Sequence, residues 1–161
     1  HKIFSRYRSY HGSTYGAGNL TGEPRRYPLA CAAGVACLNY YKDANILENV
    51  NKSGKALGEC LEEMKKTHPS VGNVRYIGLF SAVELVKDKE TREPLVPYGK
   101  DPDGIMGKLI GELKKRGFMT YSHEKMIIVA PPLIITTEQI KEELKKLDEV
   151  LYIADEFIGK R

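Results

Sequence analysis

Histidine is the residue type best suited to acid–base chemistry here, and His11 occupies the most suggestive position in the sequence. It lies between Tyr10 and Gly12, where an aromatic and basic segment (residues 2–10), predicted to be a strand, meets a glycine-rich turn. Loops at strand ends commonly carry functional side chains, and the charge of histidine changes near neutral pH. His11 is therefore a candidate functional residue, although a lone histidine is more often structural.

The remaining polar residues give weaker signals for catalysis. His123 begins the run His-Glu-Lys at a predicted hairpin tip, where a solvated turn is the favoured interpretation. Ser13 and Thr14 lack the Gly-x-Ser-x-Gly context of a nucleophile elbow. Glu84 is flanked by apolar strand residues, so if buried it needs a partner, for which Arg75 is a possibility. These residues alone assign no catalytic group.

The three cysteines do not predict a metal centre. Cys31, Cys37 and Cys60 lack metal-ligand spacing, and no histidine is close enough in sequence to complete a site. We expect buried free thiols in a reducing cytoplasm, and no bound metal.

Composition excludes several classes of protein. The chain has 161 residues and a net charge of +4, and lysine alternates with glutamate along helical stretches such as 141–146. This pattern indicates a solvated helix face rather than a nucleic-acid surface. The longest apolar run, 28–38, is shorter than the roughly 20 residues that span a bilayer. No signal peptide opens the sequence, so we predict a cytoplasmic location; its first residue, His1, suggests part of a longer protein.

The spacing of apolar residues predicts helices around a small antiparallel sheet, an α+β layer fold. An all-round apolar helix at 28–38 is expected to be buried. Asp43 is predicted to be the N-cap of an amphipathic helix ending near His68. The other expected elements, in order, are strands at 71–77 and 79–86 with a bulge or bend at Gly78, a polar loop at 87–101, a helix from Asp103 closed by Gly117, strands at 118–121 and 126–130, and a last helix opened by a Thr136–Gln139 capping box.

Several segments also resemble one known family in its order. Residues 9–14 (SYHGST), followed by 20–26 (LTGEPRR), closely resemble the segment around the cofactor ring in class III aminotransferases, the pyridoxal-phosphate enzymes of the ω-amino-acid and 4-aminobutyrate type. Further similar segments are 28–34 (PLACAAG), 74–80 (VRYIGLF) leading into 84–88 (ELVKD), and 130–136 (APPLIIT). Tyr76 stands where the family usually has glycine.

The resemblance implies a fold, a cofactor and partners. It assigns residues 1–26 to a remnant of the large pyridoxal-phosphate-binding domain and 27–161 to the C-terminal small domain of a fold-type I enzyme. Tyr10 would stack on the cofactor ring, with His11 beside it and Gly12 allowing close backbone approach. The family's substrates are amino acids and 2-oxo acids, and a homodimer is expected.

The sequence also departs from the family where the chemistry requires specific residues. The lysine that forms the Schiff base and the aspartate that pairs with the ring nitrogen belong between Arg26 and Tyr27, which are adjacent here. No arginine occupies 121–125, where several members bind a substrate carboxylate, and Lys125 offers only a point charge. Two hypotheses follow: an aminotransferase whose catalytic core is absent from this chain, and a non-catalytic binding or oligomerisation module. The chain as given is predicted to be inactive alone.

Overall fold

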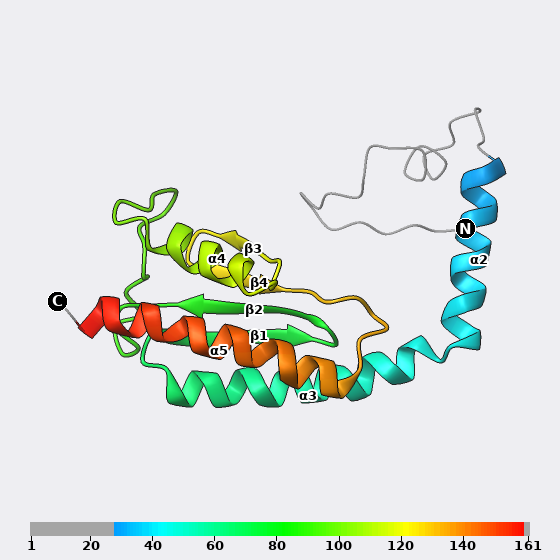
Figure 1. The fold of residues 1–161 in the computed structure, drawn as a ribbon, viewed down its shortest axis with the longest axis horizontal. Coiled ribbons are helices and arrows are strands. Elements are labelled where there is room, and N and C mark those ends of the chain that lie inside the picture. The colour runs from blue at the N-terminus through cyan, green and yellow to red at the C-terminus, as the bar shows by residue number, and fades with distance from the viewer. Residues whose placement is uncertain (1–27, 160–161) are drawn as a thin grey trace. The chain divides into compact units, whose positions relative to one another are not determined.

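The computed structural model describes residues 28–159, with the side chains of 28–30 excepted. The chain divides between Asn45 and Ile46 into two compact units, which are described separately. In the first unit the described part is helix α2 (Pro28–Asp43). The second unit holds every other described element (Figure 1).

Helix α2 corrects one expectation about burial. Its apolar composition predicted a buried helix, but residues 31–43 are exposed, including Val35 and Leu38 at 58% and 65%. Cys31 and Cys37 are exposed as well, so the expectation of buried thiols is wrong for these two residues, whereas Cys60 is half-buried.

The boundary between α2 and the next helix also differs from the prediction. Asp43 is the last residue of α2 rather than an N-cap, and α3 (Ile46–Thr67) begins after a two-residue turn. Asn45 adopts a φ of 48° in this turn, a left-handed conformation that asparagine tolerates better than most residues.

Four antiparallel strands form the sheet in the order β1-β2-β4-β3. They are β1 (Val71–Ile77), β2 (Phe80–Leu85), β3 (Tyr121–His123) and β4 (Met126–Val129). Strands β1 and β2 join through a tight turn in which Gly78 has a φ of 54°, so the predicted bend is confirmed; the pairing irregularity lies at Gly72 instead. The antiparallel α+β architecture is therefore as predicted.

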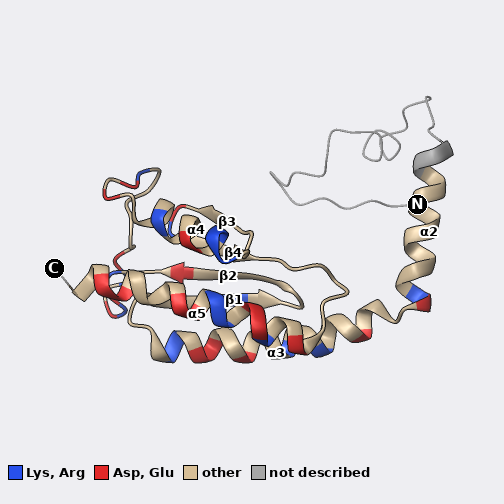
Figure 2. Ribbon diagram, viewed as in Figure 1, with Lys and Arg blue, Asp and Glu red and all other residues tan. Residues whose placement is uncertain are grey.

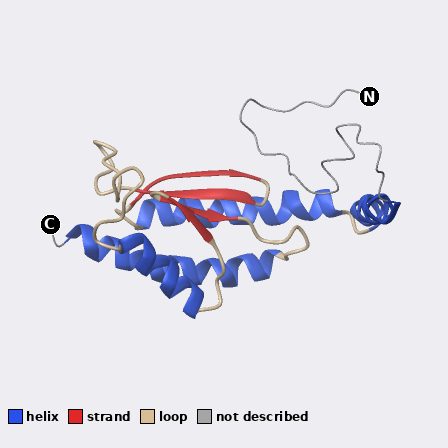
Figure 3. Cartoon of the chain, turned by 90° about the horizontal axis from the view of Figure 1, so that it is seen from above, coloured by secondary structure: helices blue, strands red, loops and turns tan. Residues whose placement is uncertain are grey.

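All three helices of this unit lie on one face of the sheet (Figure 3). Helix α3 packs on β1, and α5 (Thr137–Gly159) packs against both α3 and α4 (Ile105–Lys115). Leu144, Leu147 and Leu151 of α5 are buried, and Ile158 is half-buried against the core. Helix α5 as a whole packs mainly on the other two helices rather than on the sheet.

The C-terminal end of α4 and the start of α5 follow the sequence signals, whereas α4 does not begin at Asp103 as predicted. Gly117 ends α4 with a φ of 78°, and the Phe118 amide donates to the Leu113 carbonyl at 2.9 Å, as in a Schellman motif. Helix α4 starts at Ile105, and the carboxylate bonded to its first turn is that of Asp101, which accepts from the Gly107 amide at 3.1 Å. The capping box that opens α5 is formed in both directions, at 3.0 and 3.2 Å.

The second face of the sheet, called here the open face, carries no helix of this unit (Figure 3). Side chains alternate between the faces of a strand, so strand register assigns residues to it. Two rows cross all four strands on this face: Arg75–Ala82–Ile128–Tyr121 and Asn73–Glu84–Met126–His123.

The loop at 87–101 was predicted to be polar, but two of its residues, Leu95 and Val96, are buried in the hydrophobic core.

Charged side chains are interleaved along α3 and α5 rather than gathered by sign (Figure 2). This agrees with the solvated helix faces that the sequence predicted. Among the described helices, none combines the length and apolar character needed to cross a bilayer.

Candidate functional site

The residues predicted to contact a cofactor, Tyr10, His11 and Gly12, lie outside the described residues, as do Ser13 and Thr14. Their roles stay predictions. The described residues instead show how two of the segments that resemble the family, 74–88 and 130–136, are held in place.

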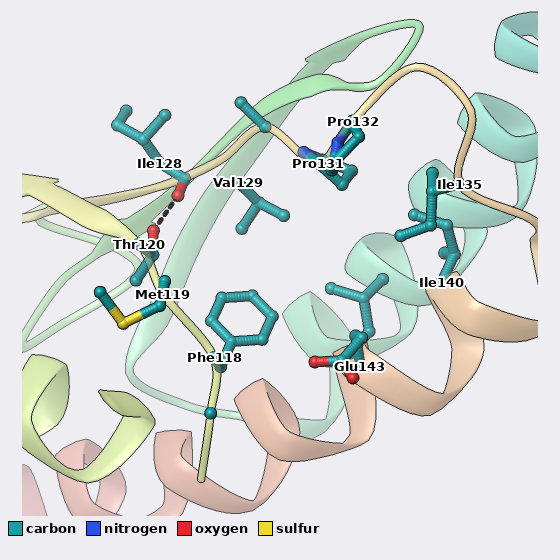
Figure 4. A pocket seen from close by; sticks show the side chains of 13 residues that line it. Phe118, Met119, Thr120, Ile128, Val129, Pro131, Pro132, Ile135, Ile140 and Glu143 are labelled. Atoms are coloured by element: carbon teal, nitrogen blue, oxygen red, sulfur yellow. Dashed lines mark hydrogen bonds between the residues drawn. The ribbon is translucent and has the colours of Figure 1, made fainter. Parts of the chain in front are cut away.

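A cleft of about 220 Å³ lies beside the Pro131-Pro132 segment (Figure 4). Phe118, Val129 and Ile140 form part of its apolar lining, together with both prolines. Its polar groups are already engaged: the Thr120 hydroxyl donates to the Ile128 carbonyl, and Glu143 pairs with Lys146 at 2.6 Å. The cleft therefore offers an apolar wall rather than a nucleophile or a general base.

Helix α3 holds the chain that follows the two prolines. The Asn49 side-chain amide donates to the carbonyls of Leu133 and Ile135, at 2.8 and 3.0 Å. The Ser53 hydroxyl, which is fully buried, donates to the Ile135 carbonyl at 3.0 Å. Three hydrogen bonds thus fix an irregular segment across more than eighty residues of sequence, and this segment leads directly into the capping box of α5.

Glu84 has the partner that its apolar neighbours required. Its carboxylate lies 2.6 Å from Lys125 Nζ and 3.8 Å from the Arg75 guanidinium, so the Arg75 prediction is confirmed and a second cation joins it. Arg75 also donates to the Met126 sulfur at 3.4 Å. Glu84, Arg75 and Met126 lie on the open face, and Lys125 lies in the turn between β3 and β4. Because Lys125 is engaged with Glu84, its point charge is already neutralised.

His123 is exposed, as the sequence favoured, but it is the last residue of β3 rather than part of the turn, because this strand covers Tyr121–His123 instead of the expected 118–121. It is exposed at the end of β3, next to a turn in which Glu124 has a φ of 54°. Its ring lies 6.5 Å from that of Tyr121, with no close stacking.

The structure reveals a buried polar cluster around His68 that sequence analysis missed. His68 is fully buried, with Nδ1 2.6 Å from Asp155 Oδ2 and Nε2 3.1 Å from Asp148 Oδ1. Tyr152 packs edge-on against the ring, at 4.6 Å between centroids, and Ser70 donates to Asp155 through its amide and its hydroxyl. The available signal was the spacing of Asp148, Tyr152 and Asp155, which places all three on one helix face.

This cluster has a structural geometry rather than a catalytic one. Both ring nitrogens of His68 are engaged by carboxylate oxygens, which leaves neither nitrogen directed at a substrate. The Ser70 hydroxyl is bonded to Asp155 instead of to the imidazole, so the cluster holds no paired nucleophile and base. The cluster ties the end of α3 to α5.

The described residues do not form a pyridoxal-phosphate site by themselves. That cofactor needs a lysine for the Schiff base, a carboxylate at its ring nitrogen and a phosphate cradle. No lysine lines the cleft beside the prolines within residues 28–159. The same part of the chain contains no cluster of metal-ligating side chains.

Residues 1–151 match the profile of the family described as aminotransferase class-III. The chain therefore belongs to the class III aminotransferase family, and four resembling segments of the sequence had predicted this assignment.

The most informative structural relative is the taurine:2-oxoglutarate aminotransferase of Bifidobacterium kashiwanohense, solved with PLP and glutamate. It is 48% identical, with a TM-score of 0.75 over 80% of this chain and 28% of its own. An acetylornithine aminotransferase of Caldanaerobacter subterraneus subsp. tengcongensis is 38% identical over 88% of this chain and 30% of its own length. Ethanolamine-phosphate phospho-lyase homolog 1 of Caenorhabditis elegans is 32% identical over 77% of this chain and 26% of its own. The chain thus spans under a third of each relative.

Proposed function

We propose that this chain is the C-terminal small domain, with a short large-domain segment, of a pyridoxal-phosphate-dependent aminotransferase. In this proposal residues 1–26 belong to the large domain and residues 27–161 form the small domain. The amino group would move from an ω-amino acid or amine to a 2-oxo acid. The observation that carries the proposal is the 48% identity to a taurine:2-oxoglutarate aminotransferase over most of the chain.

The substrates named for that relative support a proposal about the amino donor of this chain. Taurine carries its amino group at one end and a sulfonate at the other, so we expect a donor with a terminal amine and a distant anion. 2-Oxoglutarate is the corresponding acceptor. The apolar cleft beside Pro131 and Pro132 and the anchored segment after it support a wall-forming role for the small domain.

In this proposal the residues that react with the cofactor are not part of the 161-residue chain. The Schiff-base lysine and the ring-nitrogen aspartate are absent between Arg26 and Tyr27, so the 161-residue chain alone should be inactive. Incubation with pyridoxal phosphate, borohydride reduction and peptide mapping should give scattered partial labelling of surface lysines. One stoichiometrically labelled lysine together with turnover would contradict this expectation.

The alternative is a non-catalytic binding or oligomerisation module derived from a small domain. The exposed apolar helix α2 favours it. The intact mass of the protein isolated from its source cells separates the two proposals. A mass well above 18.1 kDa, with turnover of taurine or another ω-amino acid and 2-oxoglutarate, supports the enzyme. A mass of 18.1 kDa without turnover supports the module.

A cytoplasmic location belongs to the proposal as well. One relative, a probable gamma-aminobutyrate transaminase 3 of rice that is 30% identical, is named as mitochondrial. Fractionation of the source cells with an antibody against this chain distinguishes the two compartments.

A further inference from the structure

A second pocket, of about 320 Å³, lies at the edge of the sheet, away from the cleft beside the prolines. It is enclosed by the end of α3, the start of β1 and the loop after β2. We call it the basic pocket, because three of its seven lining residues are cationic: Lys65, Gly72, Asn73, Glu84, Val86, Lys89 and Arg92.

The charges of its three cations are not neutralised by the hydrogen bonds they make. Lys65 Nζ donates to the Asn73 amide oxygen at 3.3 Å, and Lys89 Nζ donates to the Lys65 carbonyl at 2.6 Å. Both acceptors are uncharged. Arg92 forms no ion pair with any residue of the described range.

The acidic groups nearby are engaged by other partners. Glu84, the one carboxylate of the lining, is shared between Lys125 and Arg75. Glu93 pairs with Lys87 at 2.6 Å. The Asp88 carboxylate accepts from the amide and hydroxyl of Thr91. The lining thus carries three cations against one shared carboxylate, whereas Asp88, which is not part of the lining, keeps its negative charge because its donors are neutral.

The loop that presents Lys89 and Arg92 is held in a defined shape. The Asp88–Thr91 hydrogen bonds close its turn, the Lys87–Glu93 ion pair spans it, and Val86 bridges to Pro94. Arg92 adopts a φ of 59°, an uncommon conformation for a residue with a side chain. The backbone that carries Lys89 and Arg92 is thus held before any ligand binds, which lowers the entropic cost of ordering the loop.

Burial and the neighbouring Lys65 lower the pKa of Lys89, whereas Asp155 opposes the shift. A bound anion would stabilise the ammonium form of Lys89.

We infer that the basic pocket is a binding site for a phosphate group, either as inorganic phosphate or as part of a phosphate monoester. A small dianion matches two ammonium groups and one guanidinium, whose planar donors suit phosphate oxygens. The Asn73 amide can supply a further hydrogen bond. This site uses none of the residues assigned to the aminotransferase cofactor.

The test is a titration of the 161-residue chain with inorganic phosphate, followed by backbone amide NMR. Saturable shifts are expected at Gly72, Asn73, Lys89 and Arg92. The double variant K65M/K89M should weaken binding at least about tenfold, because two charged hydrogen bonds to the anion are lost. Lys114→Met, at an exposed lysine of α4 outside the pocket, is the matched control and should change the affinity less than about twofold.

The outcomes also separate the two sources of phosphate. Tighter binding of glycerol phosphate than of inorganic phosphate identifies a monoester site, and the reverse identifies an inorganic phosphate site. Shifts that never saturate, or equal losses in K65M/K89M and K114M, would overturn the inference, since both indicate general attraction to a basic surface. Thermal unfolding of each variant verifies that it is folded.

Discussion

His68 Nδ1 lies 2.6 Å from Asp155 Oδ2, a contact between residues 87 positions apart that joins the end of α3 to α5. His68→Ala should destabilise the chain by about 2–5 kcal/mol, because it empties the space of a fully buried ring and removes a hydrogen-bond partner of the mostly buried Asp155 carboxylate. Chemical denaturation followed by circular dichroism measures this loss.

The two carboxylates beside His68 provide an internal comparison. Asp155 is 12% exposed and accepts three hydrogen bonds, whereas Asp148 is 42% exposed and accepts one from the ring. Asp155→Asn should therefore cost about 2 kcal/mol or more, and Asp148→Asn less than about 1 kcal/mol. Equal losses would show that the ring, rather than the Ser70 contacts, determines the energetics of the cluster.

Two glycines of α3 should differ in their tolerance of alanine. A Cβ at Gly54 would lie 2.7 Å from the backbone of Gly78, which the hairpin holds in place. A Cβ at Gly58 would meet the Tyr76 ring at 2.4 Å, but that side chain is 46% exposed and can rotate outward. Gly54→Ala should thus destabilise by more than about 2 kcal/mol and Gly58→Ala by less, as measured by urea unfolding.

Tyr76 supplies the control for this comparison. It stands where the family usually has glycine, and its ring covers Gly58. If the ring causes the cost at Gly58, Tyr76→Gly should reduce the effect of Gly58→Ala in a double-mutant cycle. Additive losses would contradict this explanation.

Much of the fold was predictable because its signals are local. The capping box at Thr136 and Gln139, the glycine that ends α4 and the strand at 71–77 each depend on a few neighbouring residues. The exposure of α2 was not predicted, because an apolar composition indicates a preference for burial without identifying the surface that would cover the helix.

The polar contacts of the structure could be predicted only where both partners lie on neighbouring elements of the sequence. Arg75 could be suggested for Glu84 because the two belong to adjacent predicted strands, but the contact with Lys125 depends on the register of a third strand. The His68 cluster joins residues that directly follow α3 to residues of α5, so only the packing of the two helices brings it together. The basic pocket likewise depends on the path of the loop after β2.

Asn49 should control the segment that follows Pro132. Its side chain donates to two carbonyls, so Asn49→Ala leaves both acceptors without this donor and should cost about 1–3 kcal/mol. Lys55→Ala is the control, because Lys55 is exposed on the same helix and makes only a long ion pair with Glu59. Amide hydrogen exchange at 133–136 should accelerate in Asn49→Ala alone; unchanged exchange would show that Ser53 suffices.

Asp88 gives the chain a defined response to acid. The amide and hydroxyl of Thr91 lower the pKa of Asp88 below its ordinary value of 3.8. Because the pKa of Asp88 is lower in the folded state, the ionised carboxylate stabilises the fold above pH 3.8. This stability is lost as the pH falls through the folded-state pKa. The stability difference between wild type and Asp88→Asn should therefore shrink below pH 3.8. A carboxyl NMR titration of Asp88 tests the direction of the shift directly.

Helix α2 should drive self-association of the 161-residue chain. Val35 and Leu38 are 58% and 65% exposed, and Tyr40 is 54% exposed, so the helix presents apolar side chains to water. A contiguous exposed apolar surface marks an association site or an aggregation liability. We therefore expect light scattering to show a dimer or larger species that dissociates on dilution. The variant V35E/L38E should be monomeric, because association would bury two carboxylates without partners. Lys42→Glu, a charge change in the same helix, is the control and should still associate. A clean monomer for wild type at high concentration would exclude α2 as an association surface, and with it the oligomerisation-module alternative.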